Sequence, residues 1–215
     1  MTRRIPLFPL PGVVLFPGTL LPLHIFEARY REMIAHALAG ERMIGMAMLK
    51  PGVDVDSGAS PIFEIGGAGQ IVDSEELEDG RYNILLEGKF RYRVLAESTA
   101  GPYRTADVEP IASLPFSSAE EGARVREIAK NLFEVIRPAI DLPPLPDADE
   151  ELEPERLASE LALRLRYRPA ELQAILETNS VPARYANLIA RMMEWQKRVQ
   201  FLAPFRPVEL DVTKN

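Results

Sequence analysis

The chain has 215 residues and a mass of 24.1 kDa, which fits one large domain or two small ones, and its hydrophobic content of 47% is ordinary for a globular protein. It contains no cysteine, which excludes disulfides and thiolate metal sites. The net charge of −7 argues against a nucleic-acid binder, because such proteins usually carry a basic patch. Prolines interrupt the apolar stretch from Ile5 to Phe26, so we expect no signal peptide, no transmembrane helix and a cytoplasmic location.

Short apolar runs separated by turn signals indicate that the first part of the chain is rich in β-structure. Asp79-Gly80 is typical of a hairpin turn, and the glycine cluster at 66–69 indicates a bulge or a sharp bend between strands. Runs at this spacing predict a small barrel or a folded sheet. They lie at residues 13–16, 43–49, 61–65, 70–72, 82–86, 90–96 and 103–108.

One helix is predicted inside this β-rich part, from Glu27 to Ala39. Gly40 follows it at the position of a left-handed C-terminal cap. The opposite, polar face carries Arg31 and Glu32, with Arg29 at its edge. The residues expected to face the core are Tyr30, Met33, Ile34 and Ala37.

After Pro115 the apolar period changes from two to about 3.6, which predicts a helical bundle over residues 116–215, after a β-rich domain over 1–115. Ser118 and Glu121 have the spacing of a capping box. Further helices are expected to begin near Pro154, Pro169 and Pro182. The first apolar stripe of this part consists of Val125, Ile128, Ala129, Leu132 and Ile136.

The segment from Asp141 to Pro154 is rich in proline and acidic residues. It has no periodic apolar face to bury, so nothing offsets the entropy of ordering it. We expect it to be the mobile loop of the helical part.

No motif for catalysis is recognisable. The one Gly-Lys pair, Gly88-Lys89, lacks the first glycine of a phosphate loop, and no G-x-S-x-G elbow occurs. The chain has two histidines, His24 and His36, too few for a zinc site without cysteine. We therefore expect no enzymatic activity, no catalytic residue, no cofactor and no metal.

Four segments carry a resemblance to a known family. The longest runs from Ile5 to Tyr30 (IPLFPLPGVVLFPGTLLPLHIFEARY), with five prolines at fixed places before the helix. The others are Gly66–Ile71, the hairpin region with Asp79–Ile84 and Gly88–Tyr92, and Glu171–Glu177 with the Arg184-Tyr185 pair after it. Together they resemble the Lon N-terminal domain family, which includes the start of ATP-dependent Lon proteases, a domain of cereblon and stand-alone bacterial proteins.

The resemblance implies an α+β fold, with a PUA-like, six-stranded β-barrel-type domain containing one helix, followed by an α-helical bundle. In Lon this domain helps to recognise protein substrates, whereas the catalytic machinery lies downstream. Because the sequence stops at Asn215, neither the ATPase motif nor the protease dyad has positions to match. A stand-alone, non-catalytic substrate-binding protein is the function that the resemblance implies.

The expected partners are unfolded or exposed polypeptide segments, with a protease or chaperone system as a further candidate. The residues proposed to contact them are Leu20, Leu21, Pro22, Arg29, Arg31 and Glu32. The alternative to a binding role is that the leucines belong to the hydrophobic core and that the charged residues form a solvated helix face. RNA binding is the alternative function, because PUA-like folds often bind RNA and the segment Lys89–Arg93 interleaves cations with aromatic residues. The net negative charge of the chain argues against nucleic-acid binding. An enzyme with a hidden carboxylate site is a third reading.

Overall fold

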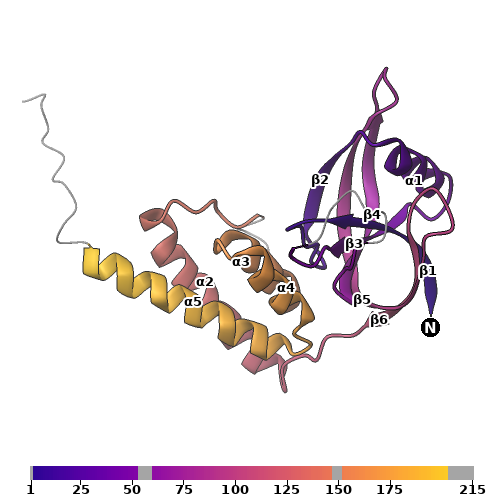
Figure 1. Ribbon diagram of the computed structural model, residues 1–215. Coiled ribbons are helices and arrows are strands. Elements are labelled where there is room, and N and C mark those ends of the chain that lie inside the picture. Colours follow the sequence, from indigo (N-terminus) through magenta and orange to yellow (C-terminus); the bar gives the residue numbers. More distant parts are fainter. Residues whose placement is uncertain (1, 53–59, 147–151, 203–215) are drawn as a thin grey trace, which may run out of the picture.

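The computed structural model describes residues 2–52, 60–146 and 152–202. These residues form a β lobe (residues 2–111) and a helical lobe (residues 119–202), which lie side by side in Figure 1. The boundary expected at residues 115 and 116 falls in the segment that joins the two lobes. The α+β fold expected from the resemblance is confirmed.

A six-stranded sheet forms the β lobe, in the order β2-β5-β4-β3-β1-β6. An additional pairing between β5 and β6 curls the sheet into a partial ring, so the expected barrel is not fully formed. The pairing of β1 with β3 is parallel, and the other pairings are antiparallel. The strands are β1 (Arg3–Leu10), β2 (Leu20–Ile25), β3 (Met43–Met48), β4 (Ile65–Glu76), β5 (Tyr82–Ser98) and β6 (Thr105–Ile111).

The sequence pattern did not predict two of the strands, because both contain proline. β1 contains Pro6 and Pro9, and β2 contains Pro22, each of which removes a ladder donor. In β1 the partner changes along the strand, with residues 3–6 paired to β6 and residues 7–10 to β3. Each half thus has one partner in the described sheet, and a proline on its open side costs no ladder bond.

The apolar run at 13–16 is an irregular segment rather than a strand. It lies against the sheet so closely that a Cβ on Gly67 would stand 2.0 Å from the Leu15 carbonyl oxygen, and one on Gly88 2.0 Å from that of Phe16. Because glycine has no Cβ, these two positions leave the space that the segment needs to pack against the sheet. The predicted bulge is confirmed between Ala68 and Gly69, inside β4 rather than between two strands.

Helix α1 (Ala28–Ala39) covers one side of the β lobe with the four core residues predicted for it. The prediction for Gly40 is wrong, because its φ of −117° is not left-handed. The left-handed residue is Arg42, with a φ of 58°. Its Nε donates to the Ile71 carbonyl at 2.9 Å, which ties the turn to β4.

The helical lobe consists of α2 (Ala119–Ile136), the short 3-10 helix η1 (Arg137–Ala139), α3 (Pro154–Arg164), α4 (Pro169–Glu177) and α5 (Val181–Leu202). Ser118 caps α2 by accepting from the Glu121 amide at 3.1 Å, while the Glu121 carboxylate turns to Ser117. The predicted stripe is partly wrong. Ile128 is 50% exposed and Phe133 is fully buried in its place, because the buried face of α2 is rotated from the one that we expected.

The proline- and acid-rich segment is anchored at both described ends. Leu142, Leu145 and Leu152 are buried in the core of the helical lobe. Their spacing is not periodic, which is why the pattern gave no sign of their burial. Residues 147–151, on which the rest of the mobile-loop prediction falls, lie outside the described residues.

Candidate functional site

β2 lies at the edge of the sheet and carries exposed apolar side chains. In the described part of the chain it pairs with β5 alone, so its other edge is open. Leu20 is 56% exposed, and Phe26, directly after the strand, is 63% exposed. No residue of β2 is charged, although charges are the usual protection of an open edge. Within the described residues the edge is therefore uncovered, and its exposed apolar side chains, Leu20, Pro22 and Phe26, are interrupted by His24. We call Leu20, Pro22 and Phe26 the apolar strip.

His24 belongs to a row of polar contacts across the outer face of β2 and β5. Its Nδ1 lies 2.8 Å from the Asn83 Oδ1, and Arg81 donates to its Nε2 at 3.2 Å. Because Nε2 accepts, the proton of the neutral ring lies on Nδ1 and is donated to Asn83. The Asn83 amide in turn donates to Glu75 at 3.0 Å. Such a row orders side chains on the surface and leaves the imidazole no free nitrogen for catalysis.

Two of the three charged residues proposed on α1, Arg29 and Arg31, have partners within the chain. Arg29 donates to the Glu27 carboxylate at 2.9 Å and lies 4.6 Å above the Tyr30 ring. Arg31 donates to the Asp79 carbonyl at 3.0 Å and so ties α1 to the tip of the β4–β5 hairpin. Glu32 is exposed. Arg31 is consequently a structural residue, whereas Arg29 and Glu32 remain accessible from solvent.

The structure does not place all six proposed residues on one face. Leu21 packs on the core that α1 covers. Leu20 and Pro22 alternate with it along the strand and so point to the opposite side of the sheet. The exposed face of α1 points away from the core on the other side. Leu20 and Pro22 thus form one candidate surface with Phe26, which sequence reasoning missed because an exposed aromatic looks the same as a buried one in a sequence.

Two fully buried arginines join the lobes. Arg91 of β5 and Arg184 of α5 are each 1% exposed. Arg91 donates to the Leu176 carbonyl at 2.9 Å and to the Asn179 side chain at 3.1 Å. Both guanidiniums donate to the Ser113 hydroxyl oxygen at 3.1 Å. We call Arg91, Ser113, Glu155 and Arg184 the interlobe network.

Glu155 supplies the carboxylate of the interlobe network. Arg184 donates to it at 2.8 Å, and the Ser113 hydroxyl also donates to it. Burial alone would raise the pKa of Glu155, but the hydrogen bonds from Ser113 and Arg184 outweigh it and hold that pKa below its ordinary value. Burial, with the nearby charge of Arg184, lowers the pKa of Arg91 to about 10, so the Arg91 guanidinium stays charged at neutral pH.

The burial of Arg91 bears on the RNA reading of the segment Lys89–Arg93. A cation that contacts phosphate must reach solvent, and Arg91 does not. The sequence did hold a signal for its position, since Arg91 and Arg184 both lie in segments that carry the family resemblance. What the sequence could not show is that these segments meet.

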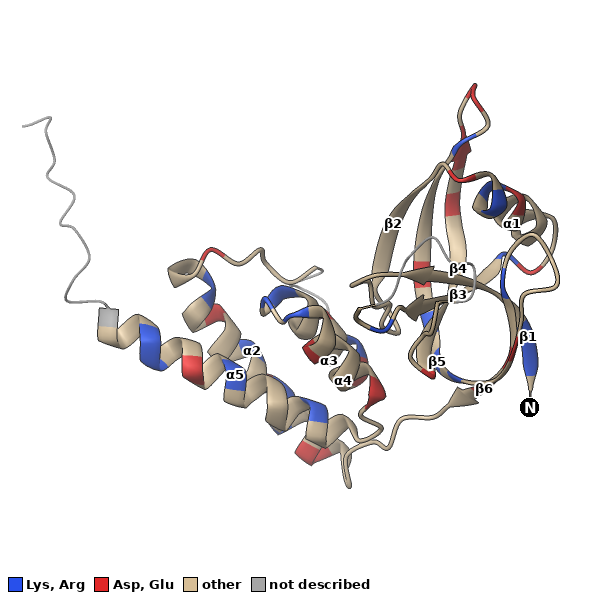
Figure 2. Cartoon of the chain, in the orientation of Figure 1, with Lys and Arg blue, Asp and Glu red and all other residues tan. Residues whose placement is uncertain are grey.

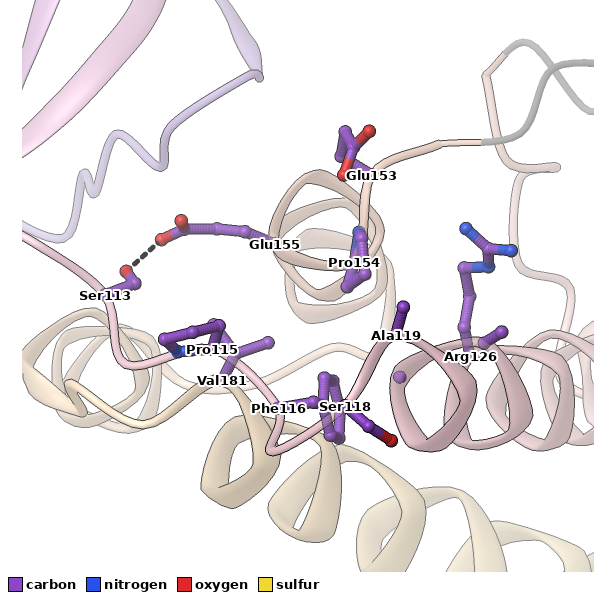
Figure 3. A pocket seen from close by; sticks show the side chains of 12 residues that line it. Ser113, Pro115, Phe116, Ser118, Ala119, Arg126, Glu153, Pro154, Glu155 and Val181 are labelled. Carbon is purple, nitrogen blue, oxygen red and sulfur yellow. Dashed lines mark hydrogen bonds between the residues drawn. The ribbon is translucent and has the colours of Figure 1, made fainter.

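An open groove of about 720 Å³ lies beside the interlobe network. Figure 3 shows Pro115, Phe116 and Val181 along one side, Pro154 opposite them, and Arg126 at one end. The remaining lining residues are Ser113, Ser118, Ala119, Gly122, Ala123, Glu153 and Glu155. Among the residues that the structure describes, no cluster of His, Asp and Glu is suited to a metal ion, and no helix is long and apolar enough to cross a membrane.

Comparison with known proteins identifies the family. Residues 4–194 match the substrate-binding domain of the ATP-dependent protease La (Lon). Over 84% of the present chain, the sequence is 29% identical to Lon protease 2 of Myxococcus xanthus. It is 31% identical to the Lon protease of Dictyoglomus thermophilum, again over 84% of the present chain. It is 27% identical to Lon protease of Escherichia coli K12 over 88%. It spans only 22%, 23% and 24% of these three relatives, in that order.

Two solved structures share the fold. A Lon N-terminal domain protein from Xanthomonas campestris superposes with a TM-score of 0.65 at 19% identity, covering 87% of this chain and 98% of that one. The N-terminal domain of Mycobacterium avium complex Lon protease gives 0.66 at 18% identity, covering 89% and 98%. On the match over residues 4–194, the chain belongs to the Lon substrate-binding domain family.

Proposed function

We propose that this chain is a non-catalytic module that binds unfolded or exposed apolar polypeptide. The observation that carries the proposal is the open, uncharged edge of β2, with Leu20 and Phe26 exposed beside it. An extended polypeptide can pair its backbone with such an edge and place alternate side chains against the apolar strip. Membership of a substrate-binding family supports the same function, with a protease or chaperone system as the downstream partner.

The expected affinity is weak. Six residues of edge give a contact at the low end of specific interfaces, below about 1,200 Å² in total, for which micromolar dissociation constants are usual. Because the strip itself is uncharged, added salt should change the affinity little. RNA binding is the alternative, and it would show the opposite behaviour, with steep weakening as salt rises.

The test is fluorescence anisotropy with a labelled unfolded peptide beside labelled RNA, each at low and high salt. Replacing both Leu20→Glu and Phe26→Glu should weaken peptide binding at least about tenfold, because charges are then opposed to apolar side chains. Leu95→Glu is the matched control, since Leu95 is 52% exposed in the same lobe and lies outside the strip. A second double variant, Arg29→Glu with Glu32→Lys, asks whether the polar face of α1 also contributes.

Loss of binding in the strip variant alone, with an unchanged melting temperature, supports the β2 edge. Equal weakening by Leu95→Glu, or tight RNA binding that falls steeply with salt, contradicts the proposal. If only the α1 variant loses binding, the polypeptide site lies on the helix and the β2 edge is excluded.

A further inference from the structure

The groove beside the interlobe network has the composition of a binding surface. Its sides are formed by Pro115, Phe116, Pro154 and Val181, none of which carries a polar side-chain atom. Its floor is one face of α2, where the side chains of Ala119 and Ala123 are small, while the Phe116 ring packs over Gly122. A volume of about 720 Å³ lies within the range of sites that hold a ligand.

The groove is held in shape by the contacts around it. Phe116 packs against Tyr185 with ring centroids 5.5 Å apart, and the Tyr185 hydroxyl donates to the Pro154 carbonyl at 2.9 Å. Glu155, on the adjoining wall, is fixed by Ser113 and Arg184. The buried Tyr185 thereby joins the opposite walls, so the space between them is preformed and a ligand need not order it.

The charges around the groove favour a cationic ligand. Glu153 is an exposed carboxylate on its lining, and the first turn of α2 is acidic, as the red ribbon at the start of that helix shows in Figure 2. Arg126, the cation of the lining, donates to the Leu152 carbonyl at 3.2 Å. The chain as a whole carries −7. An apolar trough with an acidic mouth is complementary to an apolar side chain that is followed by lysine or arginine.

We propose that this groove is a second polypeptide site, which takes an extended segment carrying an apolar side chain next to a basic one. The inference rests on the proposed function and adds a sequence preference to it. The apolar side chain lies over Ala119 and Ala123, against Phe116 and Pro154. The basic side chain lies toward Glu153 in solvent. The groove therefore adds a salt-dependent component to binding, unlike the uncharged edge of β2.

The experiment uses the whole chain and two labelled, unstructured peptides. One contains several Phe-Lys pairs, and the other is identical except that Phe-Glu replaces each pair. Ala123→Trp fills the groove from an exposed helix position, and Ala190→Trp, on the exposed surface of α5 and outside the groove, is its control. We expect Ala123→Trp to lower the affinity for the Phe-Lys peptide at least about tenfold. Glu153→Lys should lower it roughly two- to fivefold at low salt and less at high salt.

A second measurement does not depend on the tryptophan variant folding. The chain has no cysteine, so Ala123→Cys introduces a single thiol. A saturating amount of the Phe-Lys peptide should slow its alkylation by maleimide, while the thiol of an Ala190→Cys variant should react at the same rate with and without peptide.

Each outcome separates the two proposals. Phe-Lys binding that is lost only in the strip variant, with no protection at position 123, overturns the groove and leaves the proposed function standing. Equal affinity for the Phe-Lys and Phe-Glu peptides overturns the basic preference. A wild-type chain that binds neither peptide overturns both the groove and the proposed function.

Discussion

Glu155→Gln tests whether the interlobe network stabilises the fold. The substitution keeps the shape of the side chain and one acceptor oxygen, and removes the charge that faces Arg184. Hydrogen bonds to charged groups contribute about 1.5–3 kcal/mol, and breaking a buried ion pair costs about 3–5 kcal/mol. The Glu155 side chain is 34% exposed, so water compensates part of the loss. We expect a loss of about 2 kcal/mol in the free energy of unfolding, which lowers the melting temperature by about 4–8 °C at this chain length.

The stabilisation that Glu155 provides should depend on pH, and the pKa of Glu155 determines the direction of that dependence. Because the folded pKa of Glu155 lies below its ordinary value, its charge stabilises the fold fully at neutral pH. That contribution is lost as the pH falls through the ordinary value toward the folded one. The difference between the wild-type chain and Glu155→Gln should therefore shrink below about pH 4.

The assay is urea unfolding followed by circular dichroism, at pH 7 and at several acidic values. Glu134→Gln is the matched control, since Glu134 is also paired with an arginine, Arg137, but its side chain is 51% exposed. Such surface pairs contribute about 0–1 kcal/mol. The reasoning is refuted if both variants lose the same stability, or if the gap for Glu155→Gln is as large at pH 3 as at pH 7.

Two further substitutions test local packing. Gly67→Ala should cost about 1–3 kcal/mol of unfolding free energy, because its Cβ meets the Leu15 carbonyl. Gly101→Ala should be nearly neutral, because a Cβ there would lie 3.8 Å from the Tyr103 carbonyl oxygen; thermal unfolding distinguishes the two variants. Arg31→Ala should change the free energy of unfolding by no more than about 1 kcal/mol. Because the hydrogen bond to Asp79 is lost, hydrogen exchange should become faster at the Leu77 and Gly80 amides of the hairpin tip. Unchanged exchange at these amides would show that the tip does not depend on α1.

The sequence predicted elements best where one period persists. Helix α1 buries the four residues expected, and in α3 and directly after it Leu157, Leu161 and Leu165, which repeat every fourth residue, are fully buried. Both patterns are local, so they need no knowledge of the rest of the fold. The same approach did not predict β1 and β2, because both contain proline. Whether a proline interrupts a strand depends on which edge of that strand is left unpaired by the neighbouring strands.

The candidate surfaces depend on contacts between distant segments, which a period cannot show. Arg91 and Arg184 meet through Ser113, although 93 positions separate the arginines. The floor of the groove belongs to α2 and its walls to the joining segment, α3 and α5. In the same way, Leu20 and Leu21 are neighbours in the chain, yet one is exposed at the sheet edge and the other contacts the core.

The interlobe network also bears on how the two proposed sites would act together. The joining segment alone would leave the lobes free to move, which is the ordinary expectation for two bodies with a small interface. Gln173 of α4 donates to the Ile65 carbonyl of β4 at 2.9 Å, and the buried arginines add further bonds across the same junction. The β2 edge and the groove are therefore held at a fixed separation. If both proposed sites bind polypeptide, a chain bound at one would meet the other at a high effective concentration, so that two weak contacts would retain an unfolded chain that neither holds alone.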